Sequence, residues 1–285
     1  MKNYGKKITL FLIDGIPNGR ITCELSNWTG KAYKIPRIHL SESSKRDELK
    51  KPGVYLLFGK DEDSNEVVYI GEAEVLFDRL KQHLSQKDFW NETIAFISKD
   101  ENLNKAHIKY LESRLFEIAK KVNRYKIENG TTPTMSSISE ADKAEMEEFI
   151  DNIKMLTNTL GHKVFEEITE QLHKKTKNTF EINAARGAKA KGIPTSAGFV
   201  VLKGSEIASS TVQSYSKAFN QIRKNLINQG KLKKENDKLI LVEDYEFSSP
   251  STAAAIVMGR NANGLTEWKL KDGTTLKDFE TKNDK

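Results

Sequence analysis

The residues best suited to chemistry lie in the first half of the chain, in a fixed order. Two tripeptides, Gly53-Val-Tyr55 and Tyr69-Ile-Gly71, are separated by 13 residues. Arg79, His83 and Glu112 follow them along the sequence. A phenol or an imidazole can accept a proton, an arginine fork can bind phosphate oxygens, and a carboxylate can hold a divalent cation. Together these are the groups that hydrolysis of a phosphodiester requires.

The two tripeptides are predicted to lie on the two strands of one β-hairpin. Residues 53–58 and 67–70 are rich in β-branched and aromatic side chains, and the polar turn 61–65 lies between them. If Tyr55 pairs directly with Tyr69, the two phenols lie side by side on one face of the sheet. A slip of one residue in the register would send them to opposite faces.

Two predicted helices position the other groups. Residues 74–84 carry apolar side chains at helical spacing, and Arg79 and His83, four residues apart, share one face of that helix. Residues 103–122 form the clearest predicted helix, and Glu112 lies beside its apolar stripe. This helix can therefore pack on the sheet and still direct Glu112 toward the hairpin.

This order of residues resembles the GIY-YIG nuclease family. The resemblance rests on Gly53-Val-Tyr55, Tyr69-Ile-Gly71, the arginine eight residues beyond Gly71, and the helical glutamate. The interval between the tripeptides is slightly longer than is usual in that family, which lengthens a hairpin turn. The resemblance implies an active site built around one Mg²⁺ or Mn²⁺ ion.

By the same resemblance, each of these residues has an expected role. Glu112 binds the metal ion, and Arg79 stabilises the transition state. Tyr55 or Tyr69 acts as the base or orients the attacking water, and His83 is an alternative base.

Other residues complete the expected site or compete for a place in it. Gly53 and Gly71 support the two tripeptides. Many members of the family have an asparagine after the glutamate helix; Asn129 is the candidate here, and Asn123 is the alternative. Glu117 is the alternative to Glu112 as the metal ligand.

The sequence predicts an α/β (α+β) protein with two domains. The four predicted segments are an N-terminal β extension (1–50), a GIY-YIG-like nuclease domain (51–165), a linker region (166–191) and a compact α+β domain that binds DNA (192–285). In the nuclease domain, helices flank a central sheet based on the hairpin. The composition of the linker region is polar and small, and part of it is compatible with a strand of either domain.

Further elements are predicted from pattern and turn signals. In the first half these are strands at 7–13, 20–25 and 93–98, a loop at 26–37, and a helix that runs from the N-cap Ser139 to residue 160. In the second half they are strands at 198–202 and 239–242 and helices at 210–229 and 251–258.

The second half carries a resemblance of its own. Residues 249–255, 259–264 and 268–269 resemble the uncharacterised domain that trails many bacterial GIY-YIG proteins, which is similar to a domain associated with restriction enzymes and adenine methylases. That resemblance implies contact with DNA. The candidate contact residues, which offer polar donors and a stacking ring, are Arg260, Asn261, Asn263 and Trp268. The alternative is that two glycines bound a tight turn and that Trp268 is a core residue.

Composition limits the classes of function. The net charge is +6, and the first 50 residues have a net of +5, residues 51–165 a net of −4, and residues 192–285 a net of +3. Basic flanks suit a polyanion, and a carboxylate-rich middle suits a metal site. Cys23 is the single cysteine, which fits a reducing, cytoplasmic setting. No apolar run approaches the ~18 residues of a membrane span.

The sequence thus predicts a Mg²⁺- or Mn²⁺-dependent endonuclease that cleaves DNA, in bacterial defence, restriction or repair. One alternative is a DNA-binding protein that keeps a nuclease scaffold without turnover. A second is a repair nuclease that cuts only branched or damaged DNA.

Overall fold

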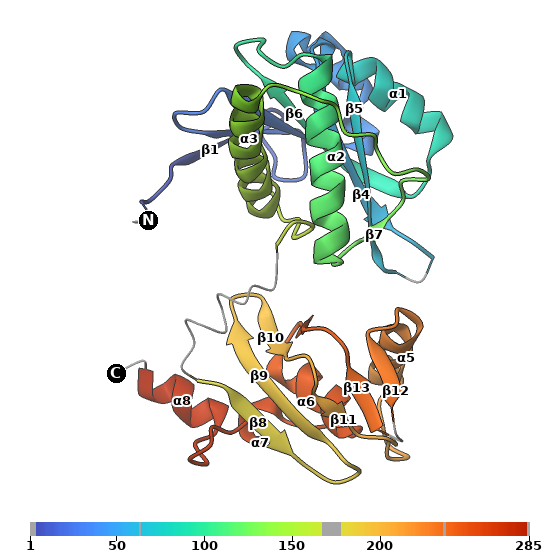
Figure 1. Cartoon of the computed structure of the whole chain (residues 1–285), viewed down its shortest axis with the longest axis vertical. Helices are drawn as coiled ribbons and strands as arrows, with labels where there is room; N and C mark the ends of the chain where they lie inside the picture. The colour runs from blue at the N-terminus through green and yellow to red at the C-terminus, as the bar shows by residue number, and fades with distance from the viewer. Residues whose placement is uncertain (1–3, 63, 167–177, 236–237, 284–285) are drawn as a thin grey trace. The chain divides into compact units, whose positions relative to one another are not determined.

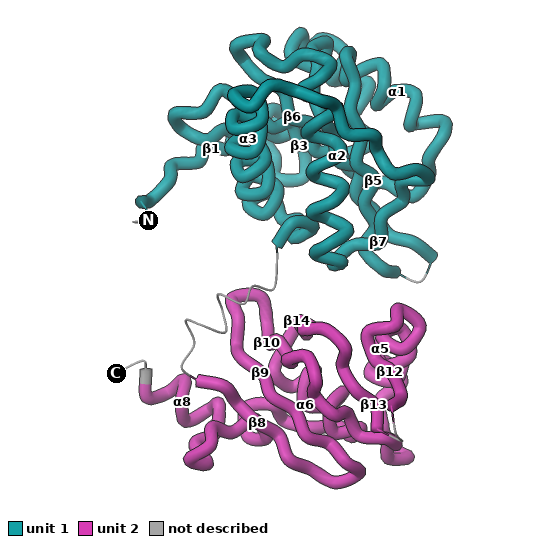
Figure 2. The backbone as a smooth tube through the Cα atoms, in the orientation of Figure 1, with its two compact units in different colours: residues 1–167 teal, residues 168–285 magenta. Residues whose placement is uncertain are grey.

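The computed structural model describes residues 4–62, 64–166, 178–235 and 238–283. The chain divides into two compact units, residues 1–167 and 168–285 (Figure 2). Each unit has its own hydrophobic core and is described by itself. None of the helices in the described ranges is both long enough and apolar enough to cross a bilayer.

The first unit is built on a seven-stranded sheet. In chain order the strands are β1 (Ile8–Leu12), β2 (Ile21–Leu25), β3 (Gly30–Pro36), β4 (Gly53–Lys60), β5 (Glu66–Ala73), β6 (Trp90–Ser98) and β7 (Lys126–Ile127). Their order across the sheet is β1-β2-β3-β6-β4-β5-β7. All neighbours are antiparallel except β5 and β7, which are parallel.

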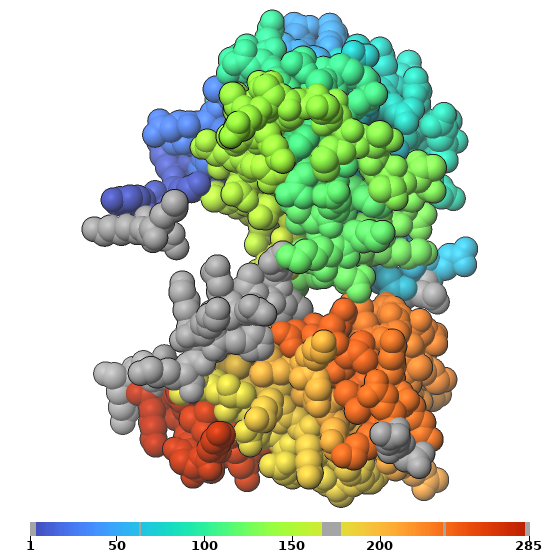
Figure 3. Space-filling model, viewed as in Figure 1, coloured from blue at the N-terminus to red at the C-terminus, as the bar shows by residue number. Residues whose placement is uncertain are grey.

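Helices cover both faces of this sheet. They are α1 (Leu76–Gln86), α2 (Lys105–Val122) and α3 (Glu140–Thr159), with 3-10 turns at Arg37–His39, Ser41–Lys45 and Asp47–Lys50. One core lies between the sheet and the α2–α3 layer, and a second lies between the sheet and α1 with the 3-10 turns (Figure 1). Side chains of α2 and α3 cover much of the front of this unit in Figure 3. The unit therefore has three layers, in agreement with the predicted central sheet and flanking helices.

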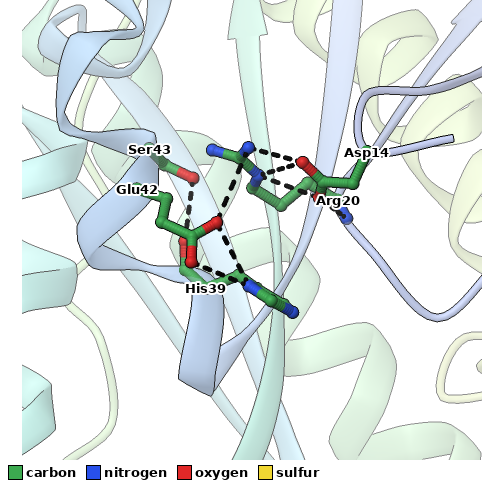
Figure 4. Close-up of polar contacts among 5 residues, drawn as sticks. All are labelled: Asp14, Arg20, His39, Glu42 and Ser43. Atoms are coloured by element: carbon green, nitrogen blue, oxygen red, sulfur yellow. Dashed lines mark hydrogen bonds and ion pairs between the residues drawn. The ribbon is translucent and has the colours of Figure 1, made fainter. Parts of the chain in front are cut away.

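The N-terminal hairpin is joined to the rest of the unit by a polar cluster (Figure 4). The Arg20 guanidinium donates to the Asp14 carboxylate, with Nη2 2.5 Å from Oδ1, and it lies 3.7 Å from Glu42. Glu42 in turn accepts from His39 at 3.2 Å. The hydrogen bonds from Arg20 hold the pKa of Asp14 well below its usual range. Because Glu42 and His39 belong to the 3-10 turns that precede β4, the β extension is part of the first unit.

One predicted loop is a strand. Residues 26–37 contain β3, which lies between β2 and β6 inside the sheet. The strand was not predicted from the sequence because Lys31, Lys34 and Pro36 interrupt its apolar residues. Lys31 and Lys34 are neutralised at the sheet surface, Lys31 by Glu24 and Glu48 and Lys34 by Glu92.

The second unit is built on another seven-stranded sheet. Its strands are β8 (Phe180–Asn183), β9 (Lys189–Thr195), β10 (Gly198–Val201), β11 (Glu206–Ile207), β12 (Leu232–Glu235), β13 (Lys238–Leu241) and β14 (Tyr245–Phe247). The order is β12-β13-β11-β9-β10-β14, with β8 paired to β9. The helices are α5 (Lys217–Asn228), α6 (Pro250–Met258), α7 (Gly264–Glu267) and α8 (Leu276–Asn283). The core centres on the buried α6 and on Phe199 and Trp268.

Two predicted boundaries in this half change. The predicted linker region 166–191 contains β8 and the start of β9, so the sheet of the second unit begins before residue 192. Small residues made this segment resemble a linker, but Ala188 and Ala190 are buried in the core. The helix predicted at 210–229 begins only at Lys217: residues 209–216 are not helical, and they contain a turn closed by the hydrogen bond from Tyr215 N–H to the Val212 carbonyl.

Candidate active site

The two tyrosines share a face of the sheet, although they are not directly opposed. Tyr55 pairs with Gly71, and Tyr69 pairs with Leu57. A two-residue offset preserves the face, so the rings lie with centroids 6.2 Å apart. Direct pairing of Tyr55 with Tyr69 does not occur, because Lys60 pairs with Glu66 across the predicted turn 61–65. Asp61 accepts hydrogen bonds from the Asn65 backbone and side chain and closes a five-residue turn.

The glycines of the two tripeptides make room for this arrangement. A Cβ at Gly71 would overlap the hydroxyl end of the Tyr55 ring and lie 2.9 Å from the Tyr69 ring. A Cβ at Gly53 would overlap the backbone carbonyl of Phe96 on the neighbouring strand. Gly71 thus lets both phenols lie over β5, and Gly53 lets β4 approach β6.

Tyr55 and His83 form a buried pair behind the site. The Tyr55 hydroxyl lies 2.7 Å from His83 Nε2, and both side chains are at most 1% exposed. Burial lowers the pKa of His83 to about 4, with further contributions from Arg79 and Lys87. Burial also raises the pKa of Tyr55 well above its usual range. Near neutral pH the imidazole and the phenol are therefore both uncharged.

Arg79 and Tyr69 lie closer to solvent. Arg79 Nε donates to the Tyr55 hydroxyl at 3.4 Å and also interacts with the Tyr69 hydroxyl, contacts that raise the pKa of the guanidinium. Tyr69 is partly exposed, and the Lys87 ammonium lies 4.4 Å from its ring centroid. Arg79 can therefore meet an anion from solvent while its other side contacts the phenols.

Glu112 is a partly buried carboxylate on α2 that ionises reluctantly. Burial raises its pKa to about 7, and the negative charge of Glu72 adds to this effect. Lys105 and Arg79 act in the opposite direction. Lys105 also forms an ion pair with Glu72 at 3.2 Å. A cation bound beside Glu112 would offset the free-energy cost of ionising this partly buried carboxylate.

Glu112 lies on α2, and the tyrosines lie on the opposite face of the sheet, beside α1. β7 pairs with β5 only at Val67 and Val68, so no strand of the described sheet covers the outer side of β5 beyond them. α2 packs on one face and α1 on the other. The charge of Arg79 on α1 nevertheless acts on Glu112 on α2.

The chemistry of these donors fits a single Mg²⁺ or Mn²⁺ ion. Among the described residues, no three His, Cys, Asp or Glu side chains come together as a metal cage. Mg²⁺ in phosphate-processing sites is usually held by one or two carboxylates and keeps several waters. Glu112, with Glu72 nearby, supplies such a donor set. Glu117 does not, because its exposed side chain pairs with Arg114 at 2.7 Å.

Asn129 fixes the strand that carries Tyr69. Its Oδ1 accepts from the Ile70 N–H at 3.0 Å, and its Nδ2 donates to the Ile70 carbonyl at 2.7 Å. The side chain thus takes the place of a neighbouring strand between Tyr69 and Gly71. Asn123 instead forms the left-handed C-cap of α2. Asn129 thus contacts the tripeptide directly.

Three charged residues at this site were not singled out from sequence: Glu72, Lys87 and Lys105. Glu72 directly follows the second tripeptide, and that position was a usable signal. Lys87 and Lys105 lie just beyond α1 and at the start of α2. Their proximity follows from how the helices pack, which a single sequence does not show.

The residues predicted to contact DNA in the second unit have mainly structural roles. Trp268 is fully buried: its ring lies 4.4 Å from Phe199, and its Nε1 donates to the Pro250 carbonyl at 3.0 Å. A role for Trp268 in stacking on bases is therefore wrong. Asn263 caps α7 by accepting from Leu265 N–H.

The other two predicted contact residues lie at the surface. Arg260 pairs with Glu267 at 2.7 Å and is 39% exposed. Asn261 is exposed, and its amide donates to the Ser214 carbonyl at 3.3 Å. Both side chains therefore already have partners within the unit.

Comparison with protein families identifies the second unit. Residues 180–280 match the model of a family described as a domain of unknown function (DUF4357). The chain carries a C-terminal DUF4357 domain. The match begins at the first residue of β8, in agreement with the earlier boundary of this unit. No match to the GIY-YIG family is found. Comparison of the chain with curated proteins, and with solved structures, finds no match in either case.

Proposed function

We propose that the first unit is a GIY-YIG-type endonuclease that hydrolyses DNA phosphodiester bonds with one Mg²⁺ or Mn²⁺ ion. One observation carries the proposal. Two phenols and a guanidinium lie together, with the Tyr55 and Tyr69 ring centroids 6.2 Å apart and Arg79 donating to Tyr55, and the charge of Arg79 acts on the Glu112 carboxylate of α2.

The exposure of each side chain suggests its role. Arg79 is accessible and offers paired donors to phosphate oxygens. Tyr69 is the phenol that a water or a substrate can reach, so it is the better candidate to orient or deprotonate the nucleophile. Tyr55 and His83 are buried, and they hold Arg79 and the floor of the site in place.

Glu112 would hold the metal ion, and Glu72 would add negative charge beside it. When bound, a divalent ion at such a site polarises the phosphate and lowers the pKa of a coordinated water. Lys105 balances the two carboxylates while the site is free of substrate. The DUF4357 domain would supply DNA affinity, in a setting of defence, restriction or repair.

Cleavage of a panel of labelled DNAs by the full chain tests this proposal. The panel contains unmodified, methylated, single-stranded and branched molecules, each with Mg²⁺ and with EDTA. Metal-dependent products support a nuclease, and a strong preference for branched DNA would favour the repair alternative. Binding without any product would favour the DNA-binding protein without turnover, and neither binding nor product would refute both.

A further inference from the structure

A positively charged stretch surrounds one helix of the second unit. Residues 207–234 contain six basic residues and no aspartate or glutamate. The whole chain has 46 basic and 40 acidic residues, so a stretch of this length with a single sign of charge is a local feature. α5 lies at its centre. Of these six residues Arg223 is buried and Lys231 pairs with Glu243, and the other four are exposed lysines, which suits a polyanion.

α5 has a buried side and a polar side. Arg223 and Leu226 are buried, and Phe219 and Ile222 pack against the core. The opposite side carries exposed residues at offsets of three, four, seven and eleven, which form one stripe. This α5 stripe consists of Lys217, Asn220, Gln221, Lys224 and Asn228. It combines two ammonium groups with three amides.

The helix is firmly attached to the unit below it. The buried Arg223 guanidinium donates to the carbonyls of Ile256 and Ala208. The Tyr215 hydroxyl, just before α5, donates to the Ala255 carbonyl at 3.2 Å. Ala255 and Ile256 belong to the buried α6, and Figure 1 shows α5 beside β12 at one side of this unit. The stripe is therefore presented on a fixed helix rather than on a loop.

We propose that the α5 stripe is the surface with which the DUF4357 domain binds duplex DNA, with α5 in the major groove. The inference rests on the proposed function in that DNA is the substrate. Lys217 and Lys224 would neutralise phosphates, and Asn220 and Gln221 would reach base edges, since amides pair with adenine there. The major groove, about 12 Å wide, admits an α-helix.

The shape of the stripe favours DNA over double-stranded RNA. The major groove of A-form RNA is too deep and narrow for side chains to read, so a polar helix has no equivalent place to dock. The stripe also contains no aromatic ring, which a platform for unpaired bases would need. Among nucleic acids, its chemistry therefore favours duplex DNA.

A salt-titrated binding assay on the full chain tests the proposal. The test variant is Lys217→Glu with Lys224→Glu. The matched control is Lys277→Glu with Lys282→Glu, two exposed lysines on α8 that give the same change in net charge. We expect the test pair to lose at least about tenfold in affinity for a 30-bp duplex near 0.1 M salt. The slope of log affinity against log salt should fall by about two, one for each phosphate contact.

The outcomes separate this inference from the proposed function. Equal losses in the test and control variants, or native affinity in the test variant, would overturn the role of the α5 stripe while leaving the nuclease proposal intact. Tighter binding of the native chain to double-stranded RNA than to duplex DNA would also overturn it. Absence of both DNA binding and cleavage in the native chain would refute the two together. The test variant should still cleave DNA at low salt, since its catalytic residues are unchanged.

A second variant examines base reading. Asn220→Ala with Gln221→Ala keeps the charge, so affinity for random DNA and the salt slope should stay native. Selection from a randomised duplex pool should show a sequence preference in the native chain that falls about tenfold or more in the variant. An unchanged preference would mean that α5 contacts only the backbone, which contradicts its placement in the major groove.

Discussion

The Tyr55 hydroxyl lies 2.7 Å from His83 Nε2, where neither side chain is more than 1% exposed. This contact distinguishes the roles of the two tyrosines, which the sequence could not rank. Tyr55 is part of the buried support of the site, and Tyr69 is its accessible phenol. The same change, removal of one hydroxyl, should therefore have different consequences at the two positions.

Tyr69→Phe should reduce the cleavage rate strongly and leave the melting temperature within about a degree of the native value, because its ring packing is unchanged. Tyr55→Phe removes the buried partner of His83 Nε2 and the acceptor of Arg79. An unpaired buried polar group costs about 1–3 kcal/mol, so the melting temperature of the first unit should fall by several degrees. Single-turnover cleavage and thermal melting of the two proteins test this. A Tyr69→Phe protein with native cleavage would move the proton transfer to another group.

Arg79→Lys should lower the rate by about 10²-fold or more, because the ammonium keeps the charge but loses the fork that matches phosphate oxygens. The control is Lys81→Gln, an exposed change on the same helix. The loss should appear in kcat rather than in DNA affinity, which we propose depends mainly on the second unit. A near-native rate for Arg79→Lys would show that Arg79 is an ordinary surface residue.

Glu112→Gln should stabilise the metal-free protein above neutral pH. The pKa of Glu112 is raised from 4.5 to about 7, so the folded state retains a proton that the unfolded state releases. The stability associated with that proton is complete below pH 4.5 and is lost as the pH rises to 7. In EDTA at pH 8, the variant should therefore melt a few degrees above the native protein, and the difference should vanish near pH 4.

The pKa of His83 is lowered from 6.5 to about 4. The stability that the neutral imidazole contributes is therefore complete above pH 6.5 and is lost as the pH falls to about 4. Subtracting the native pH profile from that of Glu112→Gln removes this common contribution. Glu117→Gln is the control and should show no such difference. If Glu112→Gln were less stable than the native protein at pH 8 in EDTA, the ionised Glu112 carboxylate would not destabilise the metal-free fold.

Trp268→Phe should lower the stability of the DUF4357 domain without weakening its DNA binding. The change removes the hydrogen bond to Pro250 and leaves a gap beside Phe199, a loss of about 1–3 kcal/mol. Measured well below the melting transition, the affinity for duplex DNA should equal that of the native chain. A folded variant with tenfold weaker binding would restore Trp268 as a contact residue.

The sequence predicted most of the first unit because local signals agreed there. The hairpin, the helix that carries Glu112 and the N-cap at Ser139 are all present, and the Ser139 hydroxyl accepts from Asp142 N–H. The predicted turn 61–65 sets the register: Lys60 pairs with Glu66, which places Tyr55 opposite Gly71 rather than Tyr69. The third strand of the sheet, β3, was missed because its lysines are neutralised by glutamates distant in sequence.

The second unit was harder to predict, since its motif residues are structural. Trp268 and Asn263 resemble contact residues by type, yet the first fills the core and the second caps a helix. A ring that stacks on a base and a ring that stacks on Phe199 have the same sequence signature. The α5 stripe was not predicted, because the predicted helix began at residue 210, before the start of α5 at Lys217. The additional residues hid the separation of α5 into one polar and one apolar face.

Metal-dependent nicking of supercoiled plasmid tests the central claim most directly. The native chain, Glu112→Gln and the control Glu117→Gln are each incubated with Mg²⁺ or with EDTA, and the nicked fraction is measured over time. We predict nicking by the native chain and by Glu117→Gln in Mg²⁺ alone, and none by Glu112→Gln under either condition. Nicking that continues in EDTA, or that Glu112→Gln retains in Mg²⁺, would contradict a divalent cation held at Glu112.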